Sequence, residues 1–103
     1  MVVQFKNAYL EKLYAGLPVS GKPRYSDDVI EKFRKRILLM CNVESAVRLR
    51  QFKSLHFEAL KGDKKGLYSI RVDHKYRLEF AIEMNKVSLI EIILIKELSN
   101  HYR

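Results

Sequence analysis

The stretch Leu60–Phe80, LKGDKKGLYSIRVDHKYRLEF, constrains the fold most, because it contains two runs of alternating side chains separated by a short polar connection. In a β-strand, alternate residues face opposite sides of the sheet, so each run has an inward and an outward set. The inward set is Ile70, Val72, Tyr76, Leu78 and Phe80, and the outward set is Ser69, Arg71, Arg77 and Glu79. With residues 73–75 as the loop, a common hairpin length, Arg71 lies directly opposite Arg77.

Two like charges that face each other across a strand pair destabilise the pair. A bound polyanion offsets this cost, so one interpretation of the outward side is a phosphate-binding surface. The other is that Glu79 and further carboxylates neutralise the arginines and that nothing binds there. The residues alone leave both interpretations open.

Composition narrows the class of protein. The 103 residues predict a single domain over 1–103, and the net charge of +8 is typical of nucleic-acid binders and of partners of acidic proteins. The single cysteine, Cys41, excludes an internal disulfide and a cysteine-based metal site, and we expect it to be buried on an apolar helical stripe. Neither a signal sequence nor a membrane span is recognisable, which predicts a cytoplasmic protein that does not contact membranes.

The order of predicted elements indicates an α+β fold. We expect an antiparallel sheet that includes an N-terminal strand, with two to three N-terminal helices packed on one of its faces. Asn7 and Ser26 are candidate N-caps, and Gly16 is expected to end the first helix. The predicted strands are 1–5, 67–72, 76–83 and 87–96, and the predicted helices are 7–16, 26–40 and 44–52. Glu91 interrupts the last strand opposite Leu78, and one interpretation is that it pairs with a buried arginine.

The outward side of this sheet carries groups that can cleave RNA without a metal or other cofactor. Such cleavage needs a base for the ribose 2′-hydroxyl, cations for the charged phosphorane and an acid for the leaving 5′-oxygen. Histidine suits proton transfer and arginine suits phosphate. The candidates are His56, His101, Lys61, Arg71 and Arg77, whereas His74 is expected to be an exposed loop residue. Tyr68, Tyr76 and Tyr102 are able to stack on bases, but Tyr68 and Tyr76 face inward as core residues and Tyr102 is near the end of the chain.

The same stretch, preceded by Leu55 and His56, resembles the HigB or "plasmid maintenance system killer" toxins of the RelE superfamily, as does the opening QFKNAYLEKLY. The resemblance implies a RelE-like microbial RNase fold and the toxin of a type II toxin–antitoxin system. It further implies a ribosome-dependent mRNA endoribonuclease, or mRNA interferase, that inhibits translation and is silenced by a helix-turn-helix, HigA-like antitoxin. Operator DNA is expected to be contacted only through the antitoxin. The alternative is a non-catalytic member of the fold that binds an antitoxin or ribosomal RNA.

The family motifs imply roles for individual residues. His56, Lys61, Arg77, His101 and Tyr102 match catalytic positions. Arg71 also matches a family position and is expected to contact phosphate. Apart from these matches, four further basic residues are expected to contact RNA, namely Lys64, Lys65, Arg48 and Arg50. Two departures from the family pattern are visible: His56 precedes Lys61 by five residues instead of three, and the chain ends in NHYR where better-known members end in DYH.

Overall fold

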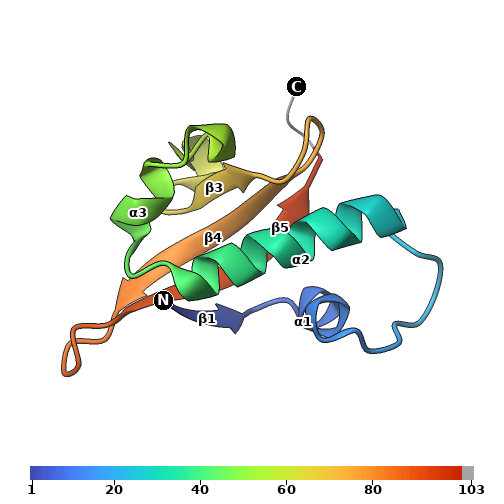
Figure 1. Ribbon diagram of the computed structural model, residues 1–103, viewed down its shortest axis with the longest axis horizontal. Coiled ribbons are helices and arrows are strands. Elements are labelled where there is room, and N and C mark those ends of the chain that lie inside the picture. The colour runs from blue at the N-terminus through green and yellow to red at the C-terminus, as the bar shows by residue number, and fades with distance from the viewer. Residues whose placement is uncertain (101–103) are drawn as a thin grey trace.

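The computed structural model describes residues 1–100 and contains a five-stranded sheet with the order β1-β5-β4-β3-β2 (Figure 1). The helices are α1 (Ala8–Ala15), α2 (Asp27–Asn42) and α3 (Ala46–Arg50), with short 3-10 turns η1 (Lys53–Leu55) and η2 (Gly62–Lys64). The strands are β1 (Val2–Phe5), β2 (Glu58–Ala59), β3 (Tyr68–Arg71), β4 (Arg77–Met84) and β5 (Glu91–Ser99). The predicted α+β architecture is therefore confirmed.

The direction of β1 differs from the expectation. β1 pairs with β5 in parallel, so the sheet is mixed, whereas we expected an antiparallel one. The two strands are connected by nearly the whole chain, and a connection of this length allows either direction. β2 was also missed, because a pair of residues is too short to show alternation.

Local capping chemistry explains why α1 and α2 begin and end where they do. The Asn7 side chain accepts a hydrogen bond from the Leu10 N–H, and Ser26 Oγ accepts one from the Val29 N–H. Gly16 ends α1 with a φ of +74°, a conformation that glycine adopts without steric cost. The predicted caps of both helices are thus confirmed.

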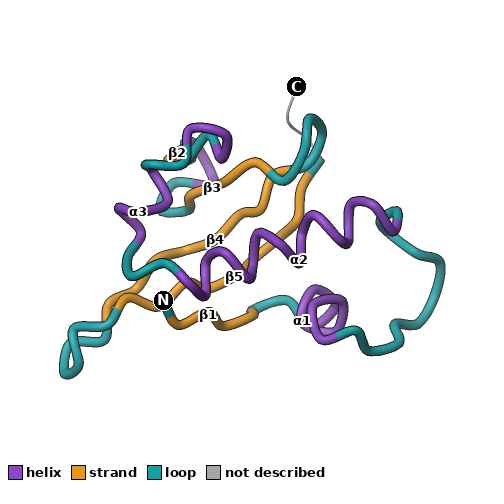
Figure 2. Tube along the Cα trace, in the orientation of Figure 1, coloured by secondary structure: helices purple, strands orange, loops and turns teal. Residues whose placement is uncertain are grey.

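The helices cover one face of the sheet, as Figures 1 and 2 show, and the core lies between the two layers. α2 contributes Phe33, Ile37 and Met40, all fully buried, against strand residues that include Ile70 and Ile93. Cys41 is exposed, so the expectation of a buried thiol was wrong. Eight residues along a helix correspond to a rotation of about 80°, which places residue 41 at the margin of the stripe centred on Phe33.

The β3–β4 hairpin has the predicted register. Arg71 is paired with Arg77, and the connecting loop is closed by a hydrogen bond of 2.9 Å from the Val72 N–H to the Tyr76 carbonyl. Tyr68 and Tyr76 are half-buried against the core, as expected of inward-facing residues.

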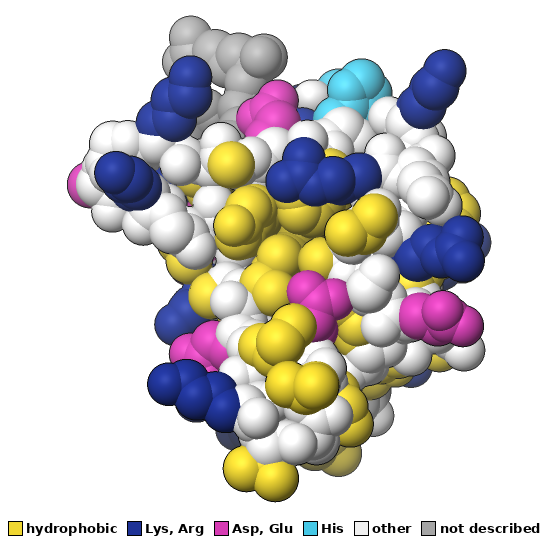
Figure 3. Space-filling model, turned by 90° about the vertical axis from the view of Figure 1, so that its left-hand side faces the viewer, with side chains coloured by type: hydrophobic (Ala, Val, Ile, Leu, Met, Phe, Trp, Pro, Cys, Tyr) yellow, Lys and Arg dark blue, Asp and Glu magenta, His cyan; other side chains and the backbone are white. Residues whose placement is uncertain are grey.

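The connection between β4 and β5 is longer than predicted. β5 begins at Glu91 instead of residue 87, and the apolar side chains of the turn are exposed, with Val87 at 95% and Leu89 at 70%. Hydrophobic side chains are visible at the lower end of the surface in Figure 3, where this turn lies. Glu91 pairs with Met84, so its predicted pairing with Leu78 was wrong. Its carboxylate accepts a hydrogen bond of 3.0 Å from the Ala46 N–H at the start of α3, which corrects the interpretation that it pairs with an arginine.

Candidate nucleic-acid interface

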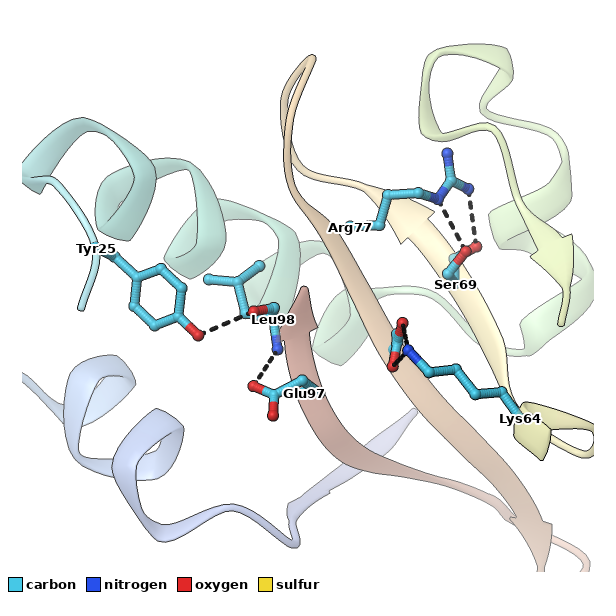
Figure 4. Close-up of polar contacts among 7 residues, drawn as sticks. Tyr25, Lys64, Ser69, Arg77, Glu97 and Leu98 are labelled. Atoms are coloured by element: carbon cyan, nitrogen blue, oxygen red, sulfur yellow. Dashed lines mark hydrogen bonds and ion pairs between the residues drawn. The ribbon is translucent and has the colours of Figure 1, made fainter. Parts of the chain in front are cut away.

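Strands β3, β4 and β5 together carry a buried polar cluster, formed by Ser69, Arg77, Glu79 and Ser99. Ser69 is paired with Glu79 and Arg77 with Ser99 in the sheet. Arg77 has only 9% of its surface exposed. Its Nε donates to Ser69 Oγ at 2.9 Å (Figure 4). Its Nη2 donates to the carbonyl of His56. Arg77 therefore fixes the segment around His56 against β3 and β4, and it is much less exposed than a phosphate-binding residue on an open sheet face was expected to be.

Glu79 in the same cluster is 2% exposed and forms an ion pair with Lys64 of η2, with Nζ and Oε2 separated by 2.8 Å (Figure 4). A buried carboxylate is costly unless it is paired. This pair ties η2 to β4. Lys64, one of the residues expected to contact RNA, therefore already has an anionic partner within the protein.

A cleft of about 400 Å³ lies beside this cluster, between α2, the residues around η1 and the β3–β4 loop. We call it the cationic cleft. Its charged and imidazole side chains are Lys32, Arg36, His56, Arg71, Asp73 and His74. Three of these carry a positive charge and one a negative charge, so the cleft favours anions.

Hydrogen bonds hold the arginines of the cleft in position. Arg36 Nε donates to the Arg71 carbonyl at 2.9 Å, and Arg71 Nε donates to the Asp73 carbonyl at 3.1 Å. α2, β3 and the hairpin loop are therefore linked in series, and the two guanidinium groups are placed by the fold.

Asp73 is the carboxylate of the cleft, and it organises the loop. Burial alone raises the pKa of Asp73, but hydrogen bonds from the N–H groups of Lys75 and Tyr76, with the nearby charges of His74 and Lys32, hold it below its ordinary value. The side chain accepts these bonds through Oδ1 at 2.9 and 2.8 Å. The carboxylate is thus directed into the turn as a structural anion.

The structure brings some of the predicted site residues together and separates others. Arg71 and His56 share the cationic cleft, and the His56 carbonyl also contacts Arg77. Lys61 and Lys65 are exposed beside η2, and Arg48 and Arg50 are exposed on α3 without lining the cleft. The guanidinium of Arg50 instead lies 4.4 Å from the centre of the Phe57 ring. His101 and Tyr102 lie outside the described residues.

Sequence reasoning missed three members of the cleft. Lys32 and Arg36 of α2 were not among the predicted site residues, and His74 was interpreted as an exposed loop residue. His74 is exposed, but it also lines the cleft. The spacing of Lys32 and Arg36, four residues apart on one helix face, was the available signal. Which loop faces that side of the helix is decided only by tertiary packing.

Other kinds of site find no support within residues 1–100. That part of the chain contains no group of three or more His, Cys, Asp or Glu side chains placed to hold a metal ion. None of its helices combines the length and the apolar character needed to cross a membrane.

Comparison with known proteins identifies the family. Residues 3–92 match the HigB-like toxins, described as the RelE-like toxin of the type II toxin–antitoxin system HigB. The chain belongs to the HigB-like toxin family. A family of this kind implies an antitoxin as the partner of the protein. No curated protein sequence matches the chain.

A solved structure supports the fold of this HigB-like toxin. The YoeB/ParE toxin from Agrobacterium tumefaciens is similar with a TM-score of 0.57 and 15% sequence identity, over 99% of this chain and 100% of that chain. At such low identity the likeness concerns the fold alone. The expected RelE-like fold is confirmed by it.

Proposed function

We propose that this HigB-like toxin is a ribosome-dependent endoribonuclease that cleaves mRNA without a metal and thereby inhibits translation in the cytoplasm. The observation that carries the proposal is the facing pair Arg71 and Arg77, placed next to the cationic cleft of a chain with a net charge of +8. Guanidinium groups in this arrangement suit a phosphate whose negative charge increases in the transition state.

The proposed reaction has two proton transfers. A base removes the proton of a ribose 2′-hydroxyl, the oxygen attacks the adjacent phosphorus, and a phosphorane forms. The bond to the 5′-oxygen then breaks, an acid donates a proton to that oxygen, and the products are a 2′,3′-cyclic phosphate and a free 5′-hydroxyl. We assign proton transfer to His101, Tyr102 or His56, and charge stabilisation to Arg77 and Lys61. Arg71 contacts the phosphate, while Lys64, Lys65, Arg48 and Arg50 are proposed to bind RNA elsewhere.

The proposed partners follow from the family. A helix-turn-helix, HigA-like antitoxin silences the toxin, and operator DNA is bound through the antitoxin. Co-expression of the antitoxin gene is expected to restore growth. An operator fragment is expected to shift on a gel with the complex and not with the toxin alone.

The burial of Arg77 favours a second candidate function. The Arg77 guanidinium is 9% exposed and is hydrogen-bonded to Ser69 and His56, so it stabilises the fold. If this structural role is its only role, the protein binds an antitoxin or ribosomal RNA without cleaving RNA. The two functions differ in one readout, which is the appearance of new mRNA ends.

The test is to incubate an mRNA with the toxin, once in a complete translation reaction and once with the ribosomes left out, and to map new mRNA ends by primer extension. We expect cleavage by the wild type only with ribosomes. His101→Ala is expected to lower the cleavage rate by about 10²- to 10⁴-fold, as for loss of a proton-transfer group. Arg71→Gln is expected to lower it by about 10²-fold through lost charge stabilisation. Arg34→Gln, which removes a charge from an exposed position of α2, is the control and should cleave normally. Inhibition of translation without new mRNA ends would establish the binding function instead.

A further inference from the structure

We propose that the cationic cleft binds a second backbone phosphate of the single-stranded RNA, next to the one at which cleavage is proposed. On this inference the RNA strand continues from the sheet across Arg71 and onto α2. The inference rests on the proposed function for the identity of the ligand as RNA. It adds Lys32, Arg36 and His74 to the residues that contact RNA.

Convergence of positive charge from separate elements is the first argument. Lys32 and Arg36 come from one face of α2 and Arg71 from the end of β3, and all three line a single cleft of about 400 Å³. His74 of the hairpin loop and His56 after η1 add imidazole groups to the same cleft. A concave surface lined by one sign of charge concentrates its field, and it binds an ion of the opposite sign.

Pre-organisation is the second argument. The hydrogen bonds of Arg36 and Arg71 to backbone carbonyls both use Nε, at 2.9 and 3.1 Å. These bonds fix the plane of each guanidinium group through its Nε. A bidentate pair with a phosphate can be formed by the other two nitrogens, Nη1 and Nη2. Binding to groups already held in place costs less side-chain entropy than ordering them on contact.

The Asp73 carboxylate also lines the cleft, and it opposes an anion. Its Oδ1 accepts the N–H groups of Lys75 and Tyr76, so that oxygen is committed to the turn. Lys32 also forms an ion pair with Asp28 at 3.0 Å, but Arg36 and Arg71 by themselves outnumber the one carboxylate that lines the cleft, so the cleft remains positive.

The cleft also adjoins the residues proposed for cleavage. Arg71 lies opposite Arg77 in the strand pairing, and the carbonyl of the cleft residue His56 accepts a hydrogen bond from Arg77. The cleft therefore shares Arg71 and His56 with the residues proposed for cleavage, which is why we assign it to a phosphate of the same RNA strand.

α2 offers a matched pair of lysines for the test. Lys32 lines the cationic cleft and forms an ion pair with Asp28, and Lys35 lines a different hollow and forms an ion pair with Glu31. Both pairs join residues four apart on the helix, at 3.0 and 3.5 Å. Lys32→Gln and Lys35→Gln thus remove the same charge and the same kind of contact, and they differ in position.

Arg36→Gln and Arg34→Gln form a second pair on the same helix, because Arg34 lines the other hollow. Arg36→Gln also loses the hydrogen bond to the Arg71 carbonyl. Thermal unfolding of each variant is therefore measured first, and Lys32→Gln carries the test if Arg36→Gln does not fold.

The measurement is fluorescence anisotropy of a labelled RNA of about ten nucleotides, a length that single-strand binding sites accommodate. All its riboses are 2′-O-methylated, so that cleavage does not occur. We expect Lys32→Gln and Arg36→Gln to weaken binding about tenfold each, which is typical of a lost charge-assisted contact. The slope of log K against log salt should become shallower by about 0.7 per variant, as expected for one phosphate on a single strand. Lys35→Gln and Arg34→Gln should change neither quantity.

Three outcomes would overturn the inference. One is equal weakening by Lys32→Gln and Lys35→Gln, which means that only net charge matters. Another is wild-type affinity in both cleft variants. The third is binding of inorganic phosphate at millimolar concentration that is lost in Lys32→Gln while the RNA affinity of that variant is unchanged, which identifies a free-anion site.

The inference and the proposed function can fail separately. If the wild type does not cleave mRNA but the cleft variants lose RNA affinity and their controls do not, the phosphate site stands and the ribonuclease assignment falls. If the wild type cleaves and the cleft variants bind RNA normally, the phosphate site falls alone.

Discussion

Asp73 shows how one residue sets the shape of the candidate interface. Its carboxylate closes the β3–β4 loop by accepting two backbone N–H groups, and the loop in turn places His74 and the Arg71 guanidinium at the cationic cleft. An aspartate side chain that bonds the backbone two residues on is a common way to build such a turn.

Asp73→Ala is expected to lower the free energy of unfolding at neutral pH by about 1 to 2 kcal/mol, because two N–H groups lose their acceptor. Asp73→Asn keeps an acceptor oxygen and is expected to cost less. Chemical denaturation of both variants measures the difference, with Asp63→Asn at an exposed position as the control. Equal stability of the wild type and Asp73→Ala would show that the loop is held by other contacts.

The charge of Asp73 also predicts a pH dependence. The folded state lowers the pKa of Asp73, so its stabilising contribution is present above the ordinary value of about 3.9 and is lost as the pH falls through the folded-state value. The stability gap between the wild type and Asp73→Asn should therefore narrow between pH 6 and pH 3. A gap that stays constant or widens on acidification would contradict this assignment.

At the scale of elements, Glu91 explains how a five-residue helix is held. Ser45, the N-cap residue of α3, makes no side-chain capping bond, and the Glu91 carboxylate of β5 accepts the Ala46 N–H in its place. A helix this short is not stable by itself, so the contact from a strand is part of what positions it.

Glu91→Ala is expected to destabilise the fold by about 1 kcal/mol, as for the loss of a helix cap. It should also raise the amide exchange rates of residues 46–50 more than those of α2. Glu83→Ala, a change at an exposed position of the neighbouring strand, is the control for lost charge and strand propensity. Hydrogen exchange followed by mass spectrometry reports both, and uniform changes across α2 and α3 would contradict a local capping role.

At the scale of the whole molecule, Tyr25 connects the loop before α2 to the last strand. Its hydroxyl donates to the Leu98 carbonyl at 2.9 Å, and its ring packs edge-on against Tyr76 of the hairpin (Figure 4 for the hydrogen bond). Burial, with a further contribution from Glu97, raises the pKa of Tyr25 to about 12. One side chain thus joins three parts of the chain that are far apart in sequence.

Tyr25→Phe is expected to lower stability by about 1 kcal/mol near neutral pH through loss of this hydrogen bond. Because the pKa of Tyr25 is higher in the folded state, its contribution is complete below about pH 10 and is lost as the pH rises through about 12. The difference between the wild type and Tyr25→Phe should therefore shrink over that interval. Tyr14→Phe, whose ring stacks on Phe5, is the control, and urea unfolding at several alkaline pH values is the measurement.

Positive charge is distributed over the surface as well as in the cleft. Figure 3 shows Lys and Arg side chains around the rim of one face, with hydrophobic side chains between them. A spread of this kind supports long-range attraction to RNA or to an acidic partner without selecting a site. Site selection has to come from the places where the fold brings such residues together.

Features set by neighbours in the sequence were predictable. Alternation and loop length determined that Arg71 faces Arg77, and short polar side chains determined the starts of α1 and α2. These patterns depend on backbone geometry over a few residues, so the chain specifies them before it folds.

Features that depend on which segments meet were decided by the tertiary structure. Apolarity of residues 87–90 predicted a strand, yet the turn leaves Val87 and Leu89 exposed, and Glu91 found its partner in α3. The parallel pairing of β1 and the meeting of α2 with the hairpin loop are contacts between distant segments as well. Local periodicity indicates the inward side of an element, whereas the packing of the whole chain determines which element covers it and which charges share a cleft.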